Sequence, residues 1–331
     1  MAKHFSNITQ MEGWDKNISD EFYIECNMEY FISNTLLRSI MSDIETYTIN
    51  PESIQFHTNT SCWDNELLKK QLEYIPISKK QLENKDINMI EIELKVENKN
   101  MEYVYVYSDE IIIKNIEKDN ILNTKDIMYT NIPLCLLGYN EEIHLTCKLE
   151  YDTKINTNSR HQAANVGMYY ENSNKIRFLI NQQTGIEPRD MITEGLQRIF
   201  VRLDNLCKNI ESANKEKVHI QYNAKMRYDF ILVGETIIGN LIEYWNNRNS
   251  KNVVVGCRRT MDQKSVIIDF GVKEFLEKGK EKEITKVFLQ LLQDIKTYIM
   301  LLVEDSKKIK VKSVSNSKYL EDINKFRRNV M

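Results

Sequence analysis

Residues 31–49 read FISNTLLRSIMSDIETYTI, and the rest of the fold can be worked out from this stretch. Its apolar residues recur at helical spacing and form one stripe of about three turns. Ser33 or Asn34 is the expected N-cap, because either side chain can accept from the free N–H groups of the first turn. Residues 59–77, NTSCWDNELLKKQLEYIPI, predict a shorter helix over 66–72 that ends before Pro76. The stripe of the first helix consists of Leu36, Leu37, Ile40, Met41, Ile44 and Tyr47.

The composition is that of a globular protein with about two domains, since 331 residues include 42% apolar and 28% charged side chains. The net charge of −3 gives no global electrostatic reason to bind nucleic acid or a membrane. No run approaches 18 apolar residues, so we expect neither a membrane span nor secretion. The six cysteines are widely separated and have no C-x-x-C pair, so we expect no metal site and no cofactor.

The first half of the chain contains a region that is mostly β. Residues 21–31 alternate as in a half-buried strand that leads into the first helix. Residues 90–96 and 101–107 also alternate, and the polar turn between them favours a hairpin. Residues 110–114 and 143–149 are two further candidate strands.

The second half returns to mixed α and β character. A strand over 175–180 precedes a helix over 188–210 that starts at Pro188, where the missing N–H is harmless. Further strands are expected over 228–233, 253–257 and 265–270, with a helix opening at 235–245. A last helix over 283–304 carries the strongest apolar stripe in the chain, with Ile284, Val287, Phe288, Leu291, Leu292, Ile295, Tyr298, Ile299 and Leu302.

The opening stretch resembles the signature of the alpha-like assembly subunits of multisubunit RNA polymerases, which include bacterial alpha, archaeal D and the eukaryotic third-largest subunits. The family pattern runs roughly N-A-L-R-R, E-V-P-T, N-T-S, D-E and R-L-G-L-I-P-L. The matching residues are Asn34, Leu36, Arg38, Ile40, Met41, Asp43, Ile44, Thr46, Asn59, Thr60, Ser61, Glu66, Leu72, Ile75, Pro76 and Ile77.

The second half is similar to the small partner subunit of the same polymerases, the archaeal L or eukaryotic eleventh type. The family's D-H-T-L-G-N-L-L corresponds to residues 235–242, which include Gly239, Asn240 and Leu241. Its P-H-P-L is not kept, because residues 260–263 read TMDQ. Both members in one chain suggest a fusion of the two assembly subunits, of the kind found in cytoplasmic large DNA viruses.

This resemblance implies an α+β fold with a split dimerisation domain. The expected order is an N-terminal arm (1–19), an alpha-like dimerisation domain in two segments (20–57 and 171–212), and an inserted β-rich domain (58–170). A linker (213–217), a small-partner domain with a long C-terminal helix (218–304) and a basic tail (305–331) follow. The tail carries a net charge of about +5, so it is the one candidate for contact with DNA.

The function implied by the resemblance is that of a non-catalytic subunit that forms an internal pseudo-dimer and seats the largest and second-largest polymerase subunits, with small assembly subunits joining. The expected location is the cytoplasm, in a viral factory or a virion if the protein is viral. The nucleus is the less favoured alternative. Arg38 is the expected donor to the second-largest subunit. The full set of expected interface residues is Asn34, Leu36, Arg38, Ile40, Met41, Asn59, Glu66, Leu72, Pro76, Leu196, Leu203, Gly239, Asn240, Leu241, Phe288, Leu291, Ile295 and Ile299.

No catalytic residues emerge from the sequence. Phosphate-binding loops, nucleophile elbows, zinc-protease motifs and the aspartate triplet of the polymerase active site are absent from it. Two alternatives stay open: a homodimeric adaptor that uses the last helix as a coiled-coil face, and an enzyme built on His57, His144 or His161 with nearby carboxylates.

Overall fold

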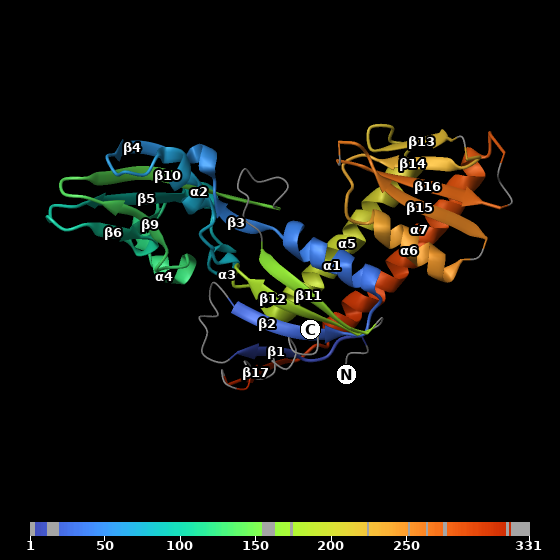
Figure 1. The fold of residues 1–331 in the computed structure, drawn as a ribbon, viewed down its shortest axis with the longest axis horizontal. Coiled ribbons are helices and arrows are strands. Elements are labelled where there is room, and N and C mark those ends of the chain that lie inside the picture. The colour runs from blue at the N-terminus through green and yellow to red at the C-terminus, as the bar shows by residue number, and fades with distance from the viewer. Residues whose placement is uncertain are drawn as a thin grey trace.

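The computed structural model describes residues 4–11, 20–153, 163–172, 175–223, 225–250, 252–262, 264–273, 277–315 and 318. Three groups of elements follow one another along the molecule. Figure 1 shows a β-rich lobe at one end, a sheet with helices in the centre, and a second sheet with helices at the other end. The fold is therefore α+β, as the sequence predicts.

The central sheet has five strands in the order β11-β12-β2-β1-β17. Its strands β2 (Asp20–Cys26) and β12 (Lys175–Gln182) pair antiparallel, with Phe22 opposite Ile180. Two segments about 150 residues apart thus share one sheet, which is the joining that the sequence predicts for this region. The remaining strands are β11 (Ala164–Asn172), β1 (Ile8–Met11) and β17 (Val311–Val314).

Residues 8–11 and 311–314 are strands of the central sheet, although the sequence expected an N-terminal arm and a basic tail outside the domains. Strand β1 pairs with β2 on one side and in parallel with β17 on the other, with Ile8 opposite Val311. Ile8 is fully buried and Ile309 is 3% exposed, so burial of these side chains holds both ends on the sheet. The expectation for residues 8–11 and 311–314 was therefore wrong, while residues 319–331 lie outside the described residues.

The long helices of the centre are α1 (Tyr30–Ser42) and α5 (Pro188–Glu211). Pro188 occupies the start of α5, as predicted. Helix α1 begins earlier than predicted, after Glu29, and it has no side-chain cap. Ser33 lies buried inside the helix, so the predicted cap was wrong.

The inserted lobe is built on a sheet in the order β3-β10-β5-β7-β8, with β4 also paired to β10. Strands β3 (Thr46–Ile49) and β4 (Gln55–Asn59) belong to this sheet, although the sequence expected residues up to 57 in the dimerisation domain. The other strands are β5 (Ile90–Glu97), β7 (Ile111–Asn115), β8 (Asn120–Leu122) and β10 (Glu142–Asp152). The short helices are α2 (Asn65–Glu73), α3 (Lys79–Leu82), α4 (Thr124–Ile127), and the 3-10 turns Pro51–Ser53, Ile87–Met89 and Ser108–Glu110.

The predicted hairpin between residues 90–96 and 101–107 does not form. Strand β5 is flanked by β10 and β7, and β6 (Val104–Tyr107) pairs with β9 (Pro133–Leu137) instead. The cause lies at Asn98, which is 2% exposed and donates from its amide to the carbonyls of Glu102, Leu137 and Gly138. These hydrogen bonds direct the chain toward β9.

The second sheet has the order β13-β14-β16-β15. Its strands β14 (Tyr228–Leu232), β15 (Val253–Arg259) and β16 (Val266–Val272) match the predicted strands, and β15 pairs antiparallel with β16. Strand β13 (Val218–Tyr222) was not predicted. Helices α6 (Gly239–Asn249) and α7 (Glu281–Ser306) pack beside this sheet.

One hydrophobic core runs continuously from the central sheet through α5 and α7 to the second sheet. The inserted lobe has a separate core of its own. None of the helices in the described part of the chain is long and apolar enough to cross a membrane. The described residues also contain no group of three or more His, Cys, Asp or Glu side chains that could hold a metal ion.

Candidate subunit interface

Helix α1 divides its predicted interface residues between the core and the surface. Leu36 and Ile40 are fully buried, while Asn34, Arg38 and Met41 are partly exposed. The buried pair packs on α5 at Gly195, where an added Cβ would lie 2.7 Å from Ile40 Cγ1. Leu36 and Ile40 therefore hold α1 on α5, and the partly exposed residues remain available to a partner.

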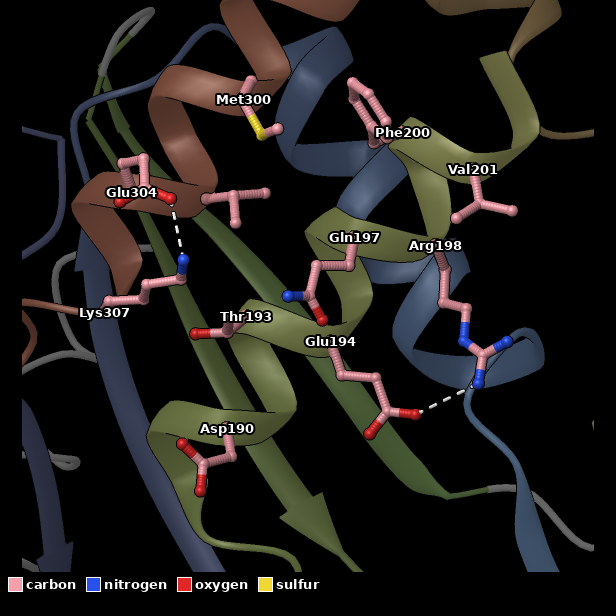
Figure 2. Close-up of a pocket in the computed structure, with 11 residues that line it drawn as sticks. Asp190, Thr193, Glu194, Gln197, Arg198, Phe200, Val201, Met300, Glu304 and Lys307 are labelled. Carbon is pink, nitrogen blue, oxygen red and sulfur yellow. Dashed lines mark hydrogen bonds and ion pairs between the residues drawn. The ribbon is translucent and has the colours of Figure 1, made fainter. Parts of the chain in front are cut away.

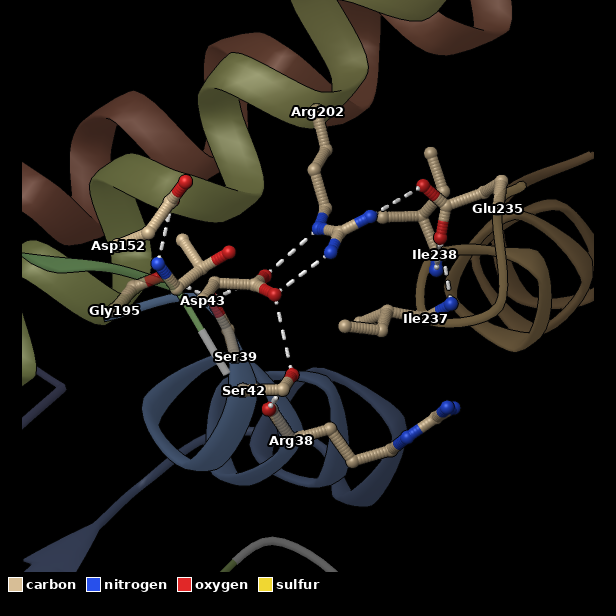
Figure 3. A network of polar contacts seen from close by, with 11 residues as sticks. Arg38, Ser39, Ser42, Asp43, Asp152, Gly195, Arg202, Glu235, Ile237 and Ile238 are labelled. Atoms are coloured by element: carbon tan, nitrogen blue, oxygen red, sulfur yellow. Dashed lines mark hydrogen bonds and ion pairs between the residues drawn. The ribbon is translucent and has the colours of Figure 1, made fainter. Parts of the chain in front are cut away.

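The end of α1 is tied to both halves of the chain by Arg202 of α5. Its guanidinium donates twice to Asp43, from Nε to Oδ2 and from Nη2 to Oδ1, each at 2.7 Å, and from Nη1 to Glu235 Oε2 at 2.9 Å. Figure 3 shows Arg202 reaching between the two carboxylates. Burial lowers the pKa of Arg202, but the hydrogen bonds with Asp43 and the charge of Glu235 outweigh it and raise the pKa above its ordinary value.

The carboxylates of Asp43 and Glu235 each accept further hydrogen bonds besides those from Arg202. Asp43 accepts from the hydroxyls of Ser39 and Ser42, each at 3.1 Å. Glu235 Oε1 accepts from the backbone N–H groups of Ile237 and Ile238 at 2.6 and 3.0 Å. These last contacts form a turn, which explains why α6 begins after residue 238 and not at 235 as predicted.

Arg38 lies beside this network without joining it. Among the described residues no carboxylate lies within ion-pair distance of its guanidinium, and Figure 3 shows the side chain pointing away from Asp43 and Arg202. Burial lowers the pKa of Arg38, and the positive charge of Arg259 lowers it further. A half-buried cation next to a second cation is a site for an anionic acceptor.

The segment 59–77 is organised by Asn59. Its amide donates to the Trp63 carbonyl at 2.9 Å and its oxygen accepts from the Ser61 hydroxyl at 2.7 Å, which fixes the turn before α2. Glu66 is exposed on α2, whereas Leu72 is 1% exposed and Pro76 is buried. Of the predicted interface residues in this segment, Glu66 is thus the one with an exposed side chain.

In the second half, Gly239 permits close packing of α6 on the sheet, because an added Cβ would lie 2.6 Å from Val266 Cγ1 and 2.7 Å from Cys257 Sγ. Leu241 is fully buried and Asn240 is exposed. The residue pattern G-N-L therefore combines two packing positions with one surface position.

Helices α5 and α7 lie antiparallel, with Thr193 beside Ser306 and Asp204 beside Lys296. The predicted stripe positions fill the space between these helices and the sheets. Val287, Leu291 and Tyr298 are the exceptions, since they are partly buried at the edge of the core. The fully buried residues are Leu196, Leu203, Phe288, Ile295 and Ile299.

Two of the histidines proposed for an enzyme, His57 and His144, lie on the sheet of the inserted lobe. His144 Nε2 lies 3.2 Å from Glu93 Oε1, and the ring centroids of His57 and His144 are 4.6 Å apart. Glu93 also forms an ion pair with Lys114, and the hydrogen bond and charge of Lys114, with a smaller contribution from His144, outweigh the effect of burial and lower the pKa of Glu93 below its ordinary value. His161 lies outside the described residues.

No protein-family model matches the chain. A comparison with known proteins finds DNA-directed RNA polymerase subunit Rpo3 of Methanocaldococcus jannaschii. The chain is similar to an archaeal polymerase subunit. The two sequences are 22% identical over 205 residues, which cover 62% of this chain and 97% of Rpo3. This similarity supports an alpha-like, non-catalytic RNA polymerase subunit, and more than a third of the chain lies outside the matched part.

Proposed function

We propose that the protein is an assembly subunit of a multisubunit DNA-dependent RNA polymerase, in which the two halves of one chain form an internal alpha-like pseudo-dimer that seats the two large catalytic subunits. The observation that carries this proposal is the similarity to Rpo3 along 97% of that subunit. The continuous core that joins the central and second sheets through α5 and α7 supports the internal pairing.

The surface proposed for the second-largest subunit is the partly exposed side of α1, together with Glu66 on α2. Arg38 is its central residue, because no carboxylate of the described part of the chain lies within ion-pair distance of its guanidinium, and the charges of Arg259 and Arg202 repel it. An acidic side chain of the partner would relieve the repulsion between Arg38 and Arg259 and complete the site. The chain contributes binding and not chemistry, and the polymerase reaction belongs to the assembled complex.

The alternative of a homodimeric adaptor is less well supported. Such an adaptor needs a free apolar stripe along the last helix. In α7 the residues at the centre of that stripe, Phe288, Ile295 and Ile299, are fully buried within the chain's own core. The stripe is therefore already used for internal packing.

The test is affinity purification of the tagged full-length protein from its native source, with wild type compared to Arg38→Glu. Lys215→Glu, which makes the same charge change in an exposed turn, is the matched control. We expect wild type and the control to recover both large polymerase subunits and Arg38→Glu to lose the second-largest subunit at least tenfold. Equal recovery by all three proteins would remove Arg38 from the interface, and recovery of no polymerase subunit by wild type would refute the assembly role.

A further inference from the structure

Tyrosine side chains are exposed along strand β6 of the inserted lobe. Tyr105 is 56% exposed and Tyr107 is 38% exposed, and Tyr103, directly before the strand, is 75% exposed. Alternate residues of a strand point to the same side, so the three side chains continue one face. Val106, which points to the other side, is fully buried in the core of the lobe.

Strand β9 widens this exposed face. Leu136 lies opposite Tyr105 and Pro133 lies opposite Tyr107, and residues directly opposite in an antiparallel pair point to the same side. The ring centroids of Tyr105 and Tyr107 are 6.1 Å apart. Contiguous exposed aromatic and apolar side chains of this kind mark a binding surface. We call this surface the tyrosine face, which consists of Tyr103, Tyr105, Tyr107, Pro133 and Leu136.

Strand β6 has a strand partner on one side only. In the described part of the chain β6 pairs with β9 alone, in a sheet of two strands. In an antiparallel pair every second residue directs its N–H and C=O toward the partner strand, and the residues between them direct these groups away from it. Figure 1 shows β6 at the outer end of the β-rich lobe. This edge can therefore accept an extended peptide as a third strand.

The two segments that carry the tyrosine face are strongly acidic. Residues 97–110 and 129–142 contain six acidic side chains and one basic side chain, which gives a net charge of −5. Glu102 and Glu110, on either side of β6, are both exposed. Charge of one sign around an aromatic surface attracts a partner of the opposite sign and repels the phosphates of nucleic acid. The charge therefore favours a basic partner.

The cavity between α5 and α7 differs from the tyrosine face in its charge. Figure 2 shows Arg198 beside Glu194 and Lys307 beside Glu304 at this cavity, and each acidic side chain is paired with the basic one. Such neutral pairs attract no particular sign of charge. The tyrosine face is the exposed apolar surface whose charge selects a class of partner.

Basic side chains also suit the tyrosine rings themselves. A lysine or arginine cation within about 6 Å of a tyrosine ring centroid is attracted to the ring. On a strand added beside β6, alternate side chains point to the tyrosine face and recur every ~6.6–6.8 Å. The tyrosines at 103, 105 and 107 alternate with the same period. Each basic side chain at an alternate position of the added strand would therefore lie beside one tyrosine.

We propose that the tyrosine face and the free edge of β6 bind an extended peptide of a partner protein that carries arginine or lysine at alternate positions. The peptide pairs with β6 as a strand, its basic side chains lie on the tyrosine rings, and the surrounding carboxylates balance their charge. This proposal concerns the inserted lobe alone and does not depend on the polymerase role.

The test is binding of a fluorescein-labelled synthetic peptide, RVRVRVR, to the full-length protein, measured by fluorescence anisotropy. The peptide RRRRVVV is the matched control, because it has the same composition and charge without the alternation. We expect RVRVRVR to bind at least tenfold more tightly than RRRRVVV, since it alone places every basic side chain on one face of a strand.

Methylation of the peptide amides tests the strand pairing. The arginine and valine residues of RVRVRVR direct their N–H groups to opposite edges of a strand. One peptide is methylated on the arginine nitrogens and the other on the valine nitrogens. We expect one of the two to lose binding and the other to keep it.

Variants of the protein test the two parts of the surface separately. Tyr105→Ser/Tyr107→Ser should weaken binding of RVRVRVR at least tenfold, because two rings are lost. Tyr244→Ser is the control, since this tyrosine is 49% exposed on α6 at the other end of the molecule (Figure 1), and it should leave binding unchanged. Glu102→Gln/Glu110→Gln should weaken binding severalfold at low salt and have little effect at 1 M salt, where exposed charges are screened.

Four results would overturn the proposal. Equal binding of RVRVRVR and RRRRVVV means that charge alone attracts the peptides. Loss of binding by both methylated peptides, or by neither, contradicts the addition of a strand to β6. Tighter binding of single-stranded oligothymidine than of RVRVRVR, lost in Tyr105→Ser/Tyr107→Ser, means that the tyrosines stack on bases. A dimer in sedimentation velocity that the same double variant abolishes means that a second copy covers the tyrosine face.

Discussion

Arg202→Leu should destabilise the protein by about 3 kcal/mol, the lower end of what breaking a buried ion pair costs. Asp43 is 4% exposed and would lose both charged hydrogen bonds from Arg202, keeping two serine hydroxyls. The lower end applies because the Arg202 side chain is itself 22% exposed, so water screens part of the interaction. With an unfolding entropy of about 0.7 kcal/mol/K for a chain of 331 residues, Tm should fall by about 4 °C.

Urea unfolding and differential scanning calorimetry measure this loss. Arg248→Leu is the control, because its ion pair with Glu29 is exposed and its removal should change the free energy of unfolding by less than about 1 kcal/mol. The double variant Asp43→Leu/Arg202→Leu should recover much of the loss, since no unpaired charge remains at Asp43. This account of the network would be refuted if the unfolding free energy of Arg202→Leu lay within 1 kcal/mol of the wild-type value. It would also be refuted if Asp43→Leu/Arg202→Leu were less stable than Arg202→Leu alone.

Three further predictions concern packing between the helices. Gly195→Ala should destabilise by about 1–3 kcal/mol in urea unfolding, because its Cβ would lie 2.7 Å from Ile40 Cγ1 and α1 would have to move. Phe288→Ala should lower the free energy of unfolding by about 3–5 kcal/mol in the same assay, because this side chain is fully buried. Leu291→Ala, at the edge of the core, should lower it clearly less. Equal losses would contradict the assigned faces of α7. Hydrogen bonds from Lys208 and Lys296 lower the pKa of Asp204 to about 2, below its value in the unfolded chain. The contribution of Asp204 to the free energy of unfolding is therefore present above about pH 4 and is lost as the pH falls toward 2. Asp204→Asn should flatten this part of the curve of unfolding free energy against pH, as measured by acid titration.

The long helices could be predicted from the sequence because one physical rule decides them. Helix α7 runs over Glu281–Ser306 against a predicted 283–304, and α5 over Pro188–Glu211 against 188–210. In each, an apolar stripe of five or more turns has to be buried, and no other conformation places those side chains on one face. Burial then fixes both the helix and the side that packs.

The strand partners could not be predicted in the same way. Alternation tells which face of a strand is buried but not which strand lies beside it. Residues 104–107 alternate as a hairpin partner of β5 would, yet the buried amide of Asn98 turns the chain to β9. Strand β17 has only four residues, VKSV, and its place in the sheet comes from a parallel partner about 300 residues earlier.

The resemblance alone marks Arg38 as a candidate interface residue, and its role there stays a prediction. The structure leaves Arg38 partly exposed, with no carboxylate of the described residues within ion-pair distance of its guanidinium. Asp43, Arg202 and Glu235 lie far apart in the sequence, and nothing in their local patterns indicates that they interact. Their buried network depends on three segments meeting, and no local pattern reports such a meeting.

The parallel pairing of β1 with β17 gives the two halves of the chain a reason to pair within one molecule. The end of α7 is held by contacts on the first half: Asp305 accepts from the backbone N–H of His4 at 2.6 Å, and the Ser306 hydroxyl lies 2.9 Å from that of Thr193. The chain that follows then adds a strand to the first half's own sheet. Exchanging the second half between two copies would require this strand and these contacts to be broken and remade together with the α5–α7 packing. Because all of them connect the same two halves, each raises the effective concentration at which the others form, so pairing within one chain is favoured over pairing between chains.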